Sequence, residues 1–223
     1  MSTQIKEHPI IFSGSMIRAI LDGSKSQTRR VISPQPVDED ECGPYIQVPE
    51  VTDWGCGETL TFMGRKHIKC PYGVPGDTLW VREMHYRYGK WIKNGITATG
   101  RQKWKFIELD DKPKNVTVRY AENAPNELSK RPAVGWYKRP SIFMPRWASR
   151  MNLTVKNVRV ERVQDISEED ARDEGVEFAP AGPGNCTNYV GGFADLWDSI
   201  NGKRGYGWDV TPWVWVVEFE RDG

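Results

Sequence analysis

The chain has 223 residues, of which 38% are hydrophobic and 27% are charged, and its formal net charge is +1. This length predicts one medium domain with insertions or at most two small domains, and no apolar run reaches the 18 residues that suggest a membrane span. The first residues show no basic region followed by a long apolar stretch, so we expect a cytoplasmic protein without a signal peptide or a membrane partner.

The N-terminal part predicts a strand, a helix and a second strand. Residues 9–12 are strand-like, and the apolar residues of 15–22 have helical spacing, with Gly23 as a stop. Residues 25–32 then predict a strand. Residues 33–76 are rich in Pro, Gly, Asp and Glu and predict an insertion with a few short strands at most. A turn at 75–77 leads into another predicted strand that ends at residue 83.

The C-terminal part predicts further strands and two helices. Residues 141–150 predict a short strand followed by a helical turn after Pro145. The apolar alternation of 151–166 slips along the segment, which indicates a strand with a bulge or bend. The remaining predicted elements are a helix capped by Ser167 that ends at Gly175, a helix over 188–200 and a central strand over 213–219. Many short strands with three helices predict an α+β fold, specifically a small mixed β-barrel with flanking short helices.

The small net charge conceals a strongly basic middle. Residues 84–150 hold 15 Lys and Arg against 5 Asp and Glu, and aromatic residues are interleaved with these charges. Basic side chains that follow phosphates, together with aromatics that stack on unpaired bases, favour a nucleic-acid partner such as RNA. The same composition also fits a solvated basic loop or a packed loop domain.

The four cysteines give little support to a metal site. Cys42, Cys56 and Cys70, with His67 nearby, contain no C-x-x-C pair, and Cys186 lies far along the chain. In a cytoplasmic protein we expect these cysteines to be reduced. We therefore expect free thiols, no metal ion and no cofactor.

The segment GSKSQTRR, residues 23–30, concentrates polar chemistry between a helix and a strand. A partly desolvated Lys25 would have a lowered pKa and could act as a base for the hydroxyl of Thr28. Positions three apart on a strand face opposite sides, so the two side chains share a cleft only if a turn or bulge intervenes. The alternative is a basic strand edge formed by Lys25, Arg29 and Arg30.

GSKSQTRR resembles the G-x-K-x-x-T-x-R segment of the ASCH domain family, which has the PUA-like fold. Three further stretches, PGDTLWV, VQDISEEDARDEG and WVWVVEF, resemble family motifs in the same order, and together the four cover roughly half of the chain. The whole chain most resembles the longer ASCH proteins of phages and prophages. The resemblance implies a single domain over 1–223 with insertions at approximately 33–73 and 84–140.

One branch of this family is an amidohydrolase that converts N(4)-acetylcytidine to cytidine and acetate with a lysine, a threonine and a glutamate. By motif position these roles fall on Lys25 as base, Thr28 as nucleophile or water-positioning group, and Glu174 as orienting group. Other members bind or cleave RNA, and the resemblance then implies a nuclease with arginines on the phosphate. The residues expected to bind substrate are Arg29, Arg30, Arg82 and Glu83.

Three hypotheses about function remain open from the sequence. The first is a hydrolase acting on a modified cytidine or on RNA. The second is a non-catalytic PUA-like module that binds RNA or modified nucleic acid. The third is a phage accessory protein whose partner is another protein. His8, His67 and His85 lie outside the core motifs, and we expect them to be structural or exposed. The sequence does not indicate an oligomeric state.

Overall fold

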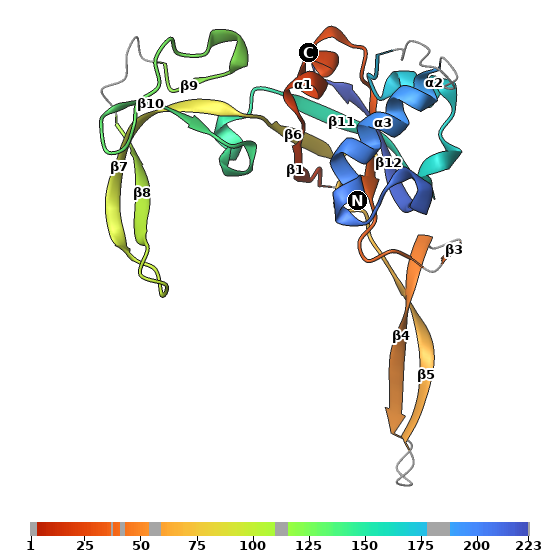
Figure 1. Cartoon of the computed structure of the whole chain (residues 1–223). Helices are drawn as coiled ribbons and strands as arrows, with labels where there is room; N and C mark the ends of the chain where they lie inside the picture. The colour runs from red at the N-terminus through yellow and green to blue at the C-terminus, as the bar shows by residue number, and fades with distance from the viewer. Residues whose placement is uncertain are drawn as a thin grey trace. The chain divides into compact units, whose positions relative to one another are not determined.

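A computed structural model describes residues 4–36, 38–40, 43–53, 59–109, 116–177 and 188–222, with side chains described outside 37–67. None of the helices in these ranges combines the length and the apolar character that crossing a membrane requires. The helices and strands are, in chain order (Figure 1), β1 (Glu7–Ile11), α1 (Gly14–Asp22), β2 (Gln27–Val31), β3 (Asp38–Asp40), β4 (Gly43–Asp53), β5 (Thr59–His67), β6 (Thr78–Arg82), β7 (His85–Ile96), β8 (Gln102–Glu108), β9 (Val118–Arg119), β10 (Gly135–Arg139), β11 (Asn152–Arg162), α2 (Glu168–Asp173), α3 (Tyr189–Asn201) and β12 (Trp213–Arg221).

The described strands form three sheets. One has five strands in the order β1-β6-β11-β12-β2, another has the order β10-β7-β8 with β9 paired to β7, and the third has the order β3-β4-β5. The predicted α+β class is confirmed by these sheets and the three short α-helices. In the described residues the five-stranded order runs from β1 to β2 without closing on itself, so the predicted barrel stays a prediction.

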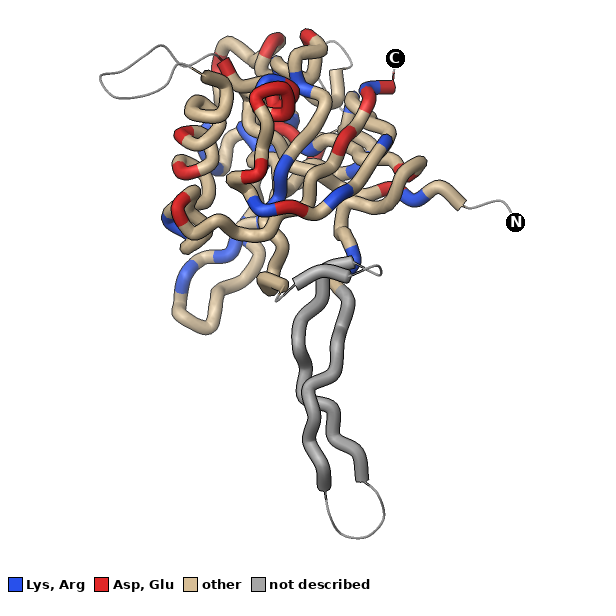
Figure 2. The backbone as a smooth tube through the Cα atoms, turned by 90° about the vertical axis from the view of Figure 1, so that its right-hand side faces the viewer, with Lys and Arg blue, Asp and Glu red and all other residues tan. Residues whose placement is uncertain are grey.

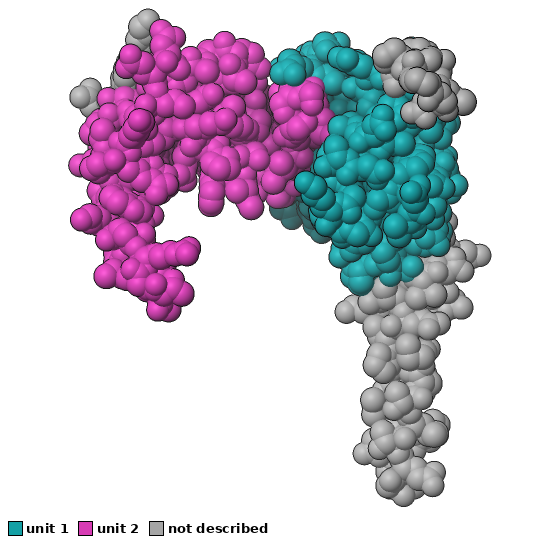
Figure 3. All heavy atoms as spheres, in the orientation of Figure 1, with its two compact units in different colours: residues 1–8, 18–79, 153–223 teal, residues 9–17, 80–152 magenta. Residues whose placement is uncertain are grey.

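The chain divides into two compact units, coloured in Figure 3. Unit 1 comprises residues 1–8, 18–79 and 153–223, and unit 2 comprises residues 9–17 and 80–152. Unit 2 contains the whole basic segment 84–150.

Strand β12 lies inside its sheet, as its nearly continuous apolar sequence predicts. It pairs antiparallel with β11 on one side and with β2 on the other. Val214, Val216 and Val217 are fully buried. A strand covered on both faces needs apolar residues at successive positions, which explains the pattern.

The register of β2 against β12 shows which side chains of β2 lie on each face of the sheet. Arg29 pairs with Val216, whereas Thr28 pairs with Val217. Successive residues of a strand point to opposite faces, so Arg29 and Thr28 lie on different faces of the sheet. The face that carries Arg29 packs on α2 and α3 through a buried cluster of Val163, Ile166, Ala171, Phe193, Trp197, Val214 and Val216.

Helix α2 positions Glu174 beside Lys25. The hydroxyl of Ser167 accepts a hydrogen bond from the backbone N–H of Asp170 at 3.1 Å, which confirms the predicted cap. Glu174 follows the helix, and Gly175 has a φ of +74°. A Cβ added at Gly175 would lie 2.9 Å from the Cβ atoms of Lys25 and Ala19. Glycine thus permits both the backbone conformation and the close approach.

Two local predictions are confirmed and two are wrong. A register shift between Val155 and Asn157 is the predicted irregularity of β11. The strand expected within 141–150 is wrong, because 3-10 helices occupy Ser141–Phe143 and Arg146–Ala148. The second of these is the predicted turn after Pro145. The expectation of short strands in 33–76 is also wrong, since β4 has 11 residues and β5 has 9. These two strands pair through backbone groups, which the side-chain pattern does not reveal.

Candidate functional site

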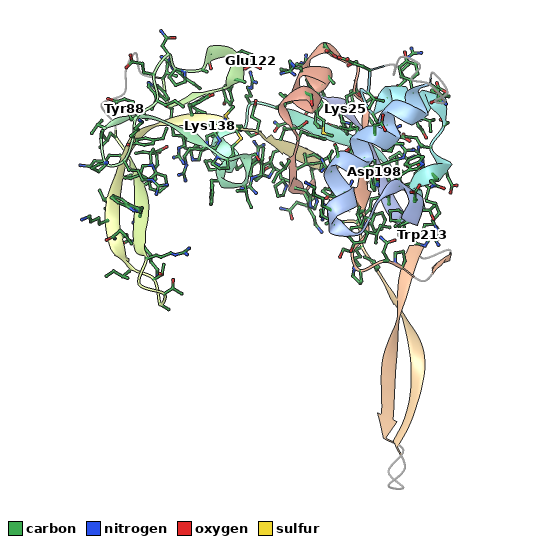
Figure 4. The ribbon with its side chains drawn as sticks, viewed as in Figure 1. Lys25, Tyr88, Glu122, Lys138, Asp198 and Trp213 are labelled. Carbon is green, nitrogen blue, oxygen red and sulfur yellow. The ribbon has the colours of Figure 1, made fainter. Side chains whose placement is uncertain are left out.

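Lys25 and Glu174 form a buried ion pair in unit 1. The Nζ of Lys25 donates to Oε2 and to the backbone oxygen of Glu174, both at 2.7 Å. The two side chains are 0% and 4% exposed. The backbones of the same two residues also form an antiparallel bridge. Lys25 (labelled in Figure 4) is thus held at both its backbone and its ammonium group.

Burial changes the acidity of Lys25. Loss of hydration lowers the pKa of its ammonium below the usual value, the carboxylate of Glu174 opposes this change, and the charges of Arg30 and Arg29 reinforce it. A lysine with a lowered pKa gives up its proton more readily. Burial and the carboxylate of Glu174 thus act on the charge of Lys25 in opposite directions.

Arg29 links this pair to a larger network of charges. Its Nη1 lies 3.5 Å from Oε1 of Glu174, and its Nη2 donates to Asp170 Oδ2 at 2.9 Å and to a carboxylate oxygen of Glu161. The side chain of Arg29 is 0% exposed. Figure 2 shows basic and acidic positions interspersed along the described backbone. Three carboxylates thus neutralise one buried guanidinium, as burial of a charge requires.

Arg159 of β11 completes the network. It donates to Asp170 at 2.8 Å and to Glu161 at 3.3 Å, and it pairs with Glu218 of β12. Burial acts to raise the pKa of Asp170, but hydrogen bonds from Gln27 and Arg29 and the charge of Arg159 hold it below its usual value. Asp170 is therefore a carboxylate in the folded protein.

The structure places the sequence-predicted residues of unit 1 in two groups. The carboxylate of Glu174 contacts both Lys25 and Arg29. The strand register puts Thr28 on the opposite face from Arg29. Thr28 is 2% exposed. Arg30 shares the face of Thr28 by register, and burial lowers the pKa of its guanidinium. Lys25 and Glu174 therefore meet, which the sequence left open, and the catalytic roles of Lys25, Thr28 and Glu174 stay predictions.

The other two predicted substrate-binding residues belong to unit 2. The carboxylate of Glu83 is 6% exposed and accepts two hydrogen bonds from Arg150, at 2.8 and 2.9 Å. Arg150 also donates to Glu122 (labelled in Figure 4). The guanidinium of Arg82 donates to the backbone oxygen of Ile142 and lies 5.2 Å from the ring centroid of Trp80. The partner of Glu83 is thus Arg150 rather than its neighbour Arg82.

The residues considered for zinc are only partly described. Cys42, Cys56 and Cys186, and the side chain of His67, lie outside the described residues. Cys70 is half-buried, and burial raises the pKa of its thiol to about 11, so it is protonated near neutral pH. No group of three or more His, Cys, Asp or Glu within the described part of the chain is placed to hold a metal ion.

Two histidines have structural surroundings, in line with the expectation for them. His8 Nε2 lies 3.2 Å from Asp77, which also accepts from the backbone N–H groups of Lys6 and Val74. His85 is 0% exposed, and its Nδ1 lies 3.2 Å from the backbone oxygen of Glu83. Burial lowers the pKa of His85 to about 4, so this imidazole is neutral at pH 7.

Sequence reasoning missed Arg159, Glu161 and Glu218 as members of the charge network. Arg159 and Glu161 are separated by one residue in a predicted strand and therefore share a face. That pattern could have indicated a polar stripe. That Arg29 of β2 lies on the same face as Arg159 and Glu161 follows only from the register. Val216 of β12 pairs with Arg29 on one side and with Arg159 on the other.

Comparisons with protein-family models, with curated proteins and with solved structures gave no match to this chain. The site is therefore interpreted from its own residues and geometry.

Proposed function

We propose that this chain is an ASCH-type hydrolase acting on a modified cytidine, as the nucleoside or within RNA, with Lys25 as the proton carrier. The observation that carries the proposal is the buried Lys25–Glu174 pair at 2.7 Å, formed between residues 149 positions apart. Burial lowers the pKa of Lys25, as a lysine that acts as a base requires.

The finer fold assignment belongs to the same proposal. A PUA-like barrel would use the five strands β1, β6, β11, β12 and β2, with α1 and α2 beside them. The α+β class and the adjacency of β2, β12 and β11 support this assignment. The segments that resemble the family lie on these elements.

The proposed reaction is acyl transfer to water. Neutral Lys25 accepts a proton from the attacking oxygen, which belongs to water or to Thr28, as that oxygen bonds to the acetyl carbon. The tetrahedral intermediate then collapses, the C–N bond breaks, and Lys25 returns the proton to the leaving nitrogen. If Thr28 attacks, water hydrolyses the resulting ester. Glu174 stabilises the protonated Lys25 between the two steps. The products are cytidine and acetate.

The test uses Lys25→Arg, which keeps the positive charge but cannot serve as a base because arginine stays protonated. We expect Lys25→Arg and Lys25→Met each to lose about 10²-fold or more of the turnover of N(4)-acetylcytidine. Lys203→Met, at an exposed lysine of unit 1, should retain full turnover. Acetate release would be measured for each protein, with thermal unfolding to confirm that it is folded.

Thr28→Val tests the second residue, since valine keeps the β-branched shape in the strand. Loss of turnover would support a reacting hydroxyl, and unchanged turnover would assign the attack to water. Full activity of a folded Lys25→Arg variant would overturn the proposal. Binding of the nucleoside without turnover by the unaltered protein would favour the non-catalytic PUA-like module instead.

A further inference from the structure

One face of the unit 2 sheet combines arginines with aromatic rings. Arg87 pairs with Tyr137, and Trp91 pairs with Phe106, so each pair lies on one side of the sheet. Arg87 and Trp91 are four positions apart on β7, and Arg139 is two positions from Tyr137 on β10. Even spacing on a strand keeps them all on this side. We call these five residues the arginine–aromatic face.

The arginines of this region stack on the rings. Measured from guanidinium carbon to ring centroid, Arg131 lies 4.2 Å from Trp91, and Arg139 lies 4.9 Å from Trp91 and 5.0 Å from Phe106. Arg87 lies 6.0 Å from Phe106. The rings also contact each other edge to face, with Trp91 and Phe106 at 5.4 Å. These contacts place the guanidinium groups against the aromatic rings.

Two exposed aromatic side chains extend the face. Phe143 and Trp147, on the adjoining 3-10 helices, are 57% and 55% exposed. Arg139 lies 5.2 Å from the ring of Phe143, and Arg87 lies 5.1 Å from the ring of Trp147. An exposed ring beside a cation is the combination that stacks on a base next to its phosphate.

Positive charge exceeds negative charge on this face. Glu108 pairs with Arg87, and Arg131 and Arg139 add two further positive charges close by. The Nε atoms of Arg87 and Arg139 are buried without a hydrogen-bond partner among the described residues. Burial and the nearby charge of Arg131 both lower the pKa of Arg139. A bound anion would relieve this crowding of like charges.

We propose that the arginine–aromatic face, extended by Arg131, Phe143 and Trp147, binds single-stranded nucleic acid. The guanidinium groups hold successive phosphates, and the rings of Phe143 and Trp147 stack on unpaired bases. A duplex keeps its bases stacked on each other, and an acidic peptide lacks planar groups for these rings. This surface captures the nucleic-acid form of the substrate, and in that respect the inference rests on the proposed function.

The test measures binding of a labelled single-stranded RNA of about 12 nucleotides, and of DNA with the same sequence, to the full chain. We expect Trp147→Ala to weaken binding about 10-fold, because one stacked base is lost. Ile142→Ala should leave binding unchanged, since Ile142 is 58% exposed on the neighbouring 3-10 helix but has no ring.

Arg131→Gln should reduce the slope of log affinity against log salt by about 0.7. Lys138→Gln is its matched control, because Lys138 (labelled in Figure 4) is exposed and alternates with Arg139 onto the other face.

Three outcomes would overturn the inference. The first is an equal loss of RNA affinity in Trp147→Ala and Ile142→Ala. The second is binding of duplex RNA as tight as that of single-stranded RNA. The third is a polyglutamate peptide that competes as well as a single-stranded RNA of the same charge. The last would indicate an acidic protein as the partner. The proposed hydrolase function is tested separately, by measuring the turnover of free N(4)-acetylcytidine.

Discussion

Lys25 shows how much of the site a short motif can reveal. The motif resemblance pointed to Lys25 and Glu174, and the structure brings them together at 2.7 Å. The partners of Arg29 could not be predicted in this way. Its contacts with Glu161 and Asp170 join residues 132 and 141 positions away, and they depend on which strands are neighbours. Residue type and spacing predict a charged site, but sheet register determines which charges neutralise each other.

His85 makes the stability of the protein depend on pH. Its pKa is about 4 in the folded protein and near 6.5 for a free histidine, so the unfolded chain binds more protons between these values. The stabilisation is therefore present above pH 6.5 and is lost as the pH falls toward 4. We expect the free energy of unfolding to drop by about 2 kcal/mol from this group between pH 7 and pH 5.

Urea unfolding at both pH values checks this expectation, with His85→Asn as the comparison. Asparagine can keep a donor to the backbone oxygen of Glu83 but does not titrate. The free energy of unfolding should decrease from pH 7 to pH 5 by about 2 kcal/mol less in the variant than in the unaltered protein. Equal decreases in both proteins would mean that His85 is charged in the fold.

The end of helix α2 is the element that sets the geometry of the site. Ser167 and Gly175 were recognisable as its boundaries because caps follow from local backbone chemistry. Strand β12 was recognisable because burial on both faces gives a continuous apolar run. The β4–β5 hairpin and the 3-10 helix Ser141–Phe143 were not recognised, since their sequences lack a regular apolar period. Local rules thus predicted the elements around Lys25 better than those of the insertions.

Gly175→Ala tests how closely α2 is packed against Lys25. Alanine at a φ of +74° costs about 1 kcal/mol, and a Cβ 2.9 Å from the Cβ of Lys25 adds overpacking of about 1–3 kcal/mol. Gly205→Ala is the matched control, because Gly205 has a φ of +82° and nothing within 4 Å of an added Cβ. We expect Gly175→Ala to be the more destabilising of the two in urea unfolding. An equal loss of unfolding free energy in the two variants would show that the end of α2 can move away from Lys25 at no energetic cost.

Charge is distributed unevenly over the whole molecule. Charge counting along the sequence singled out 84–150, and this segment falls entirely within unit 2. The sequence indicated one domain with insertions or at most two small domains, and it did not indicate which residues each unit contains. Composition reports where charge accumulates, whereas the grouping of residues 9–17 with 80–152 depends on contacts between distant segments.

This distribution predicts unusual behaviour in ion exchange. At the sequence pI of ≈7.6 the net charge is close to zero, yet we expect retention on a sulfonate column through unit 2. The double substitution Lys103→Glu with Lys138→Glu should elute at lower salt than Lys6→Glu with Lys203→Glu. Both pairs change the total charge equally at exposed positions, so identical elution would contradict a localised basic surface.

The position of β12 between β2 and β11 also affects the order of events during synthesis. Residues 27–31 leave the ribosome long before residues 213–221, which pair with them. At a synthesis rate of about 5–20 residues per second, β2 waits roughly 10–40 s for its neighbour. For most of that interval Arg29 has neither the strand nor the carboxylates that neutralise it in the fold, because Glu161 and Asp170 also lie late in the chain. The nascent chain therefore carries Lys25 and Arg29 as hydrated cations, and the charge network assembles only after translation has passed β12.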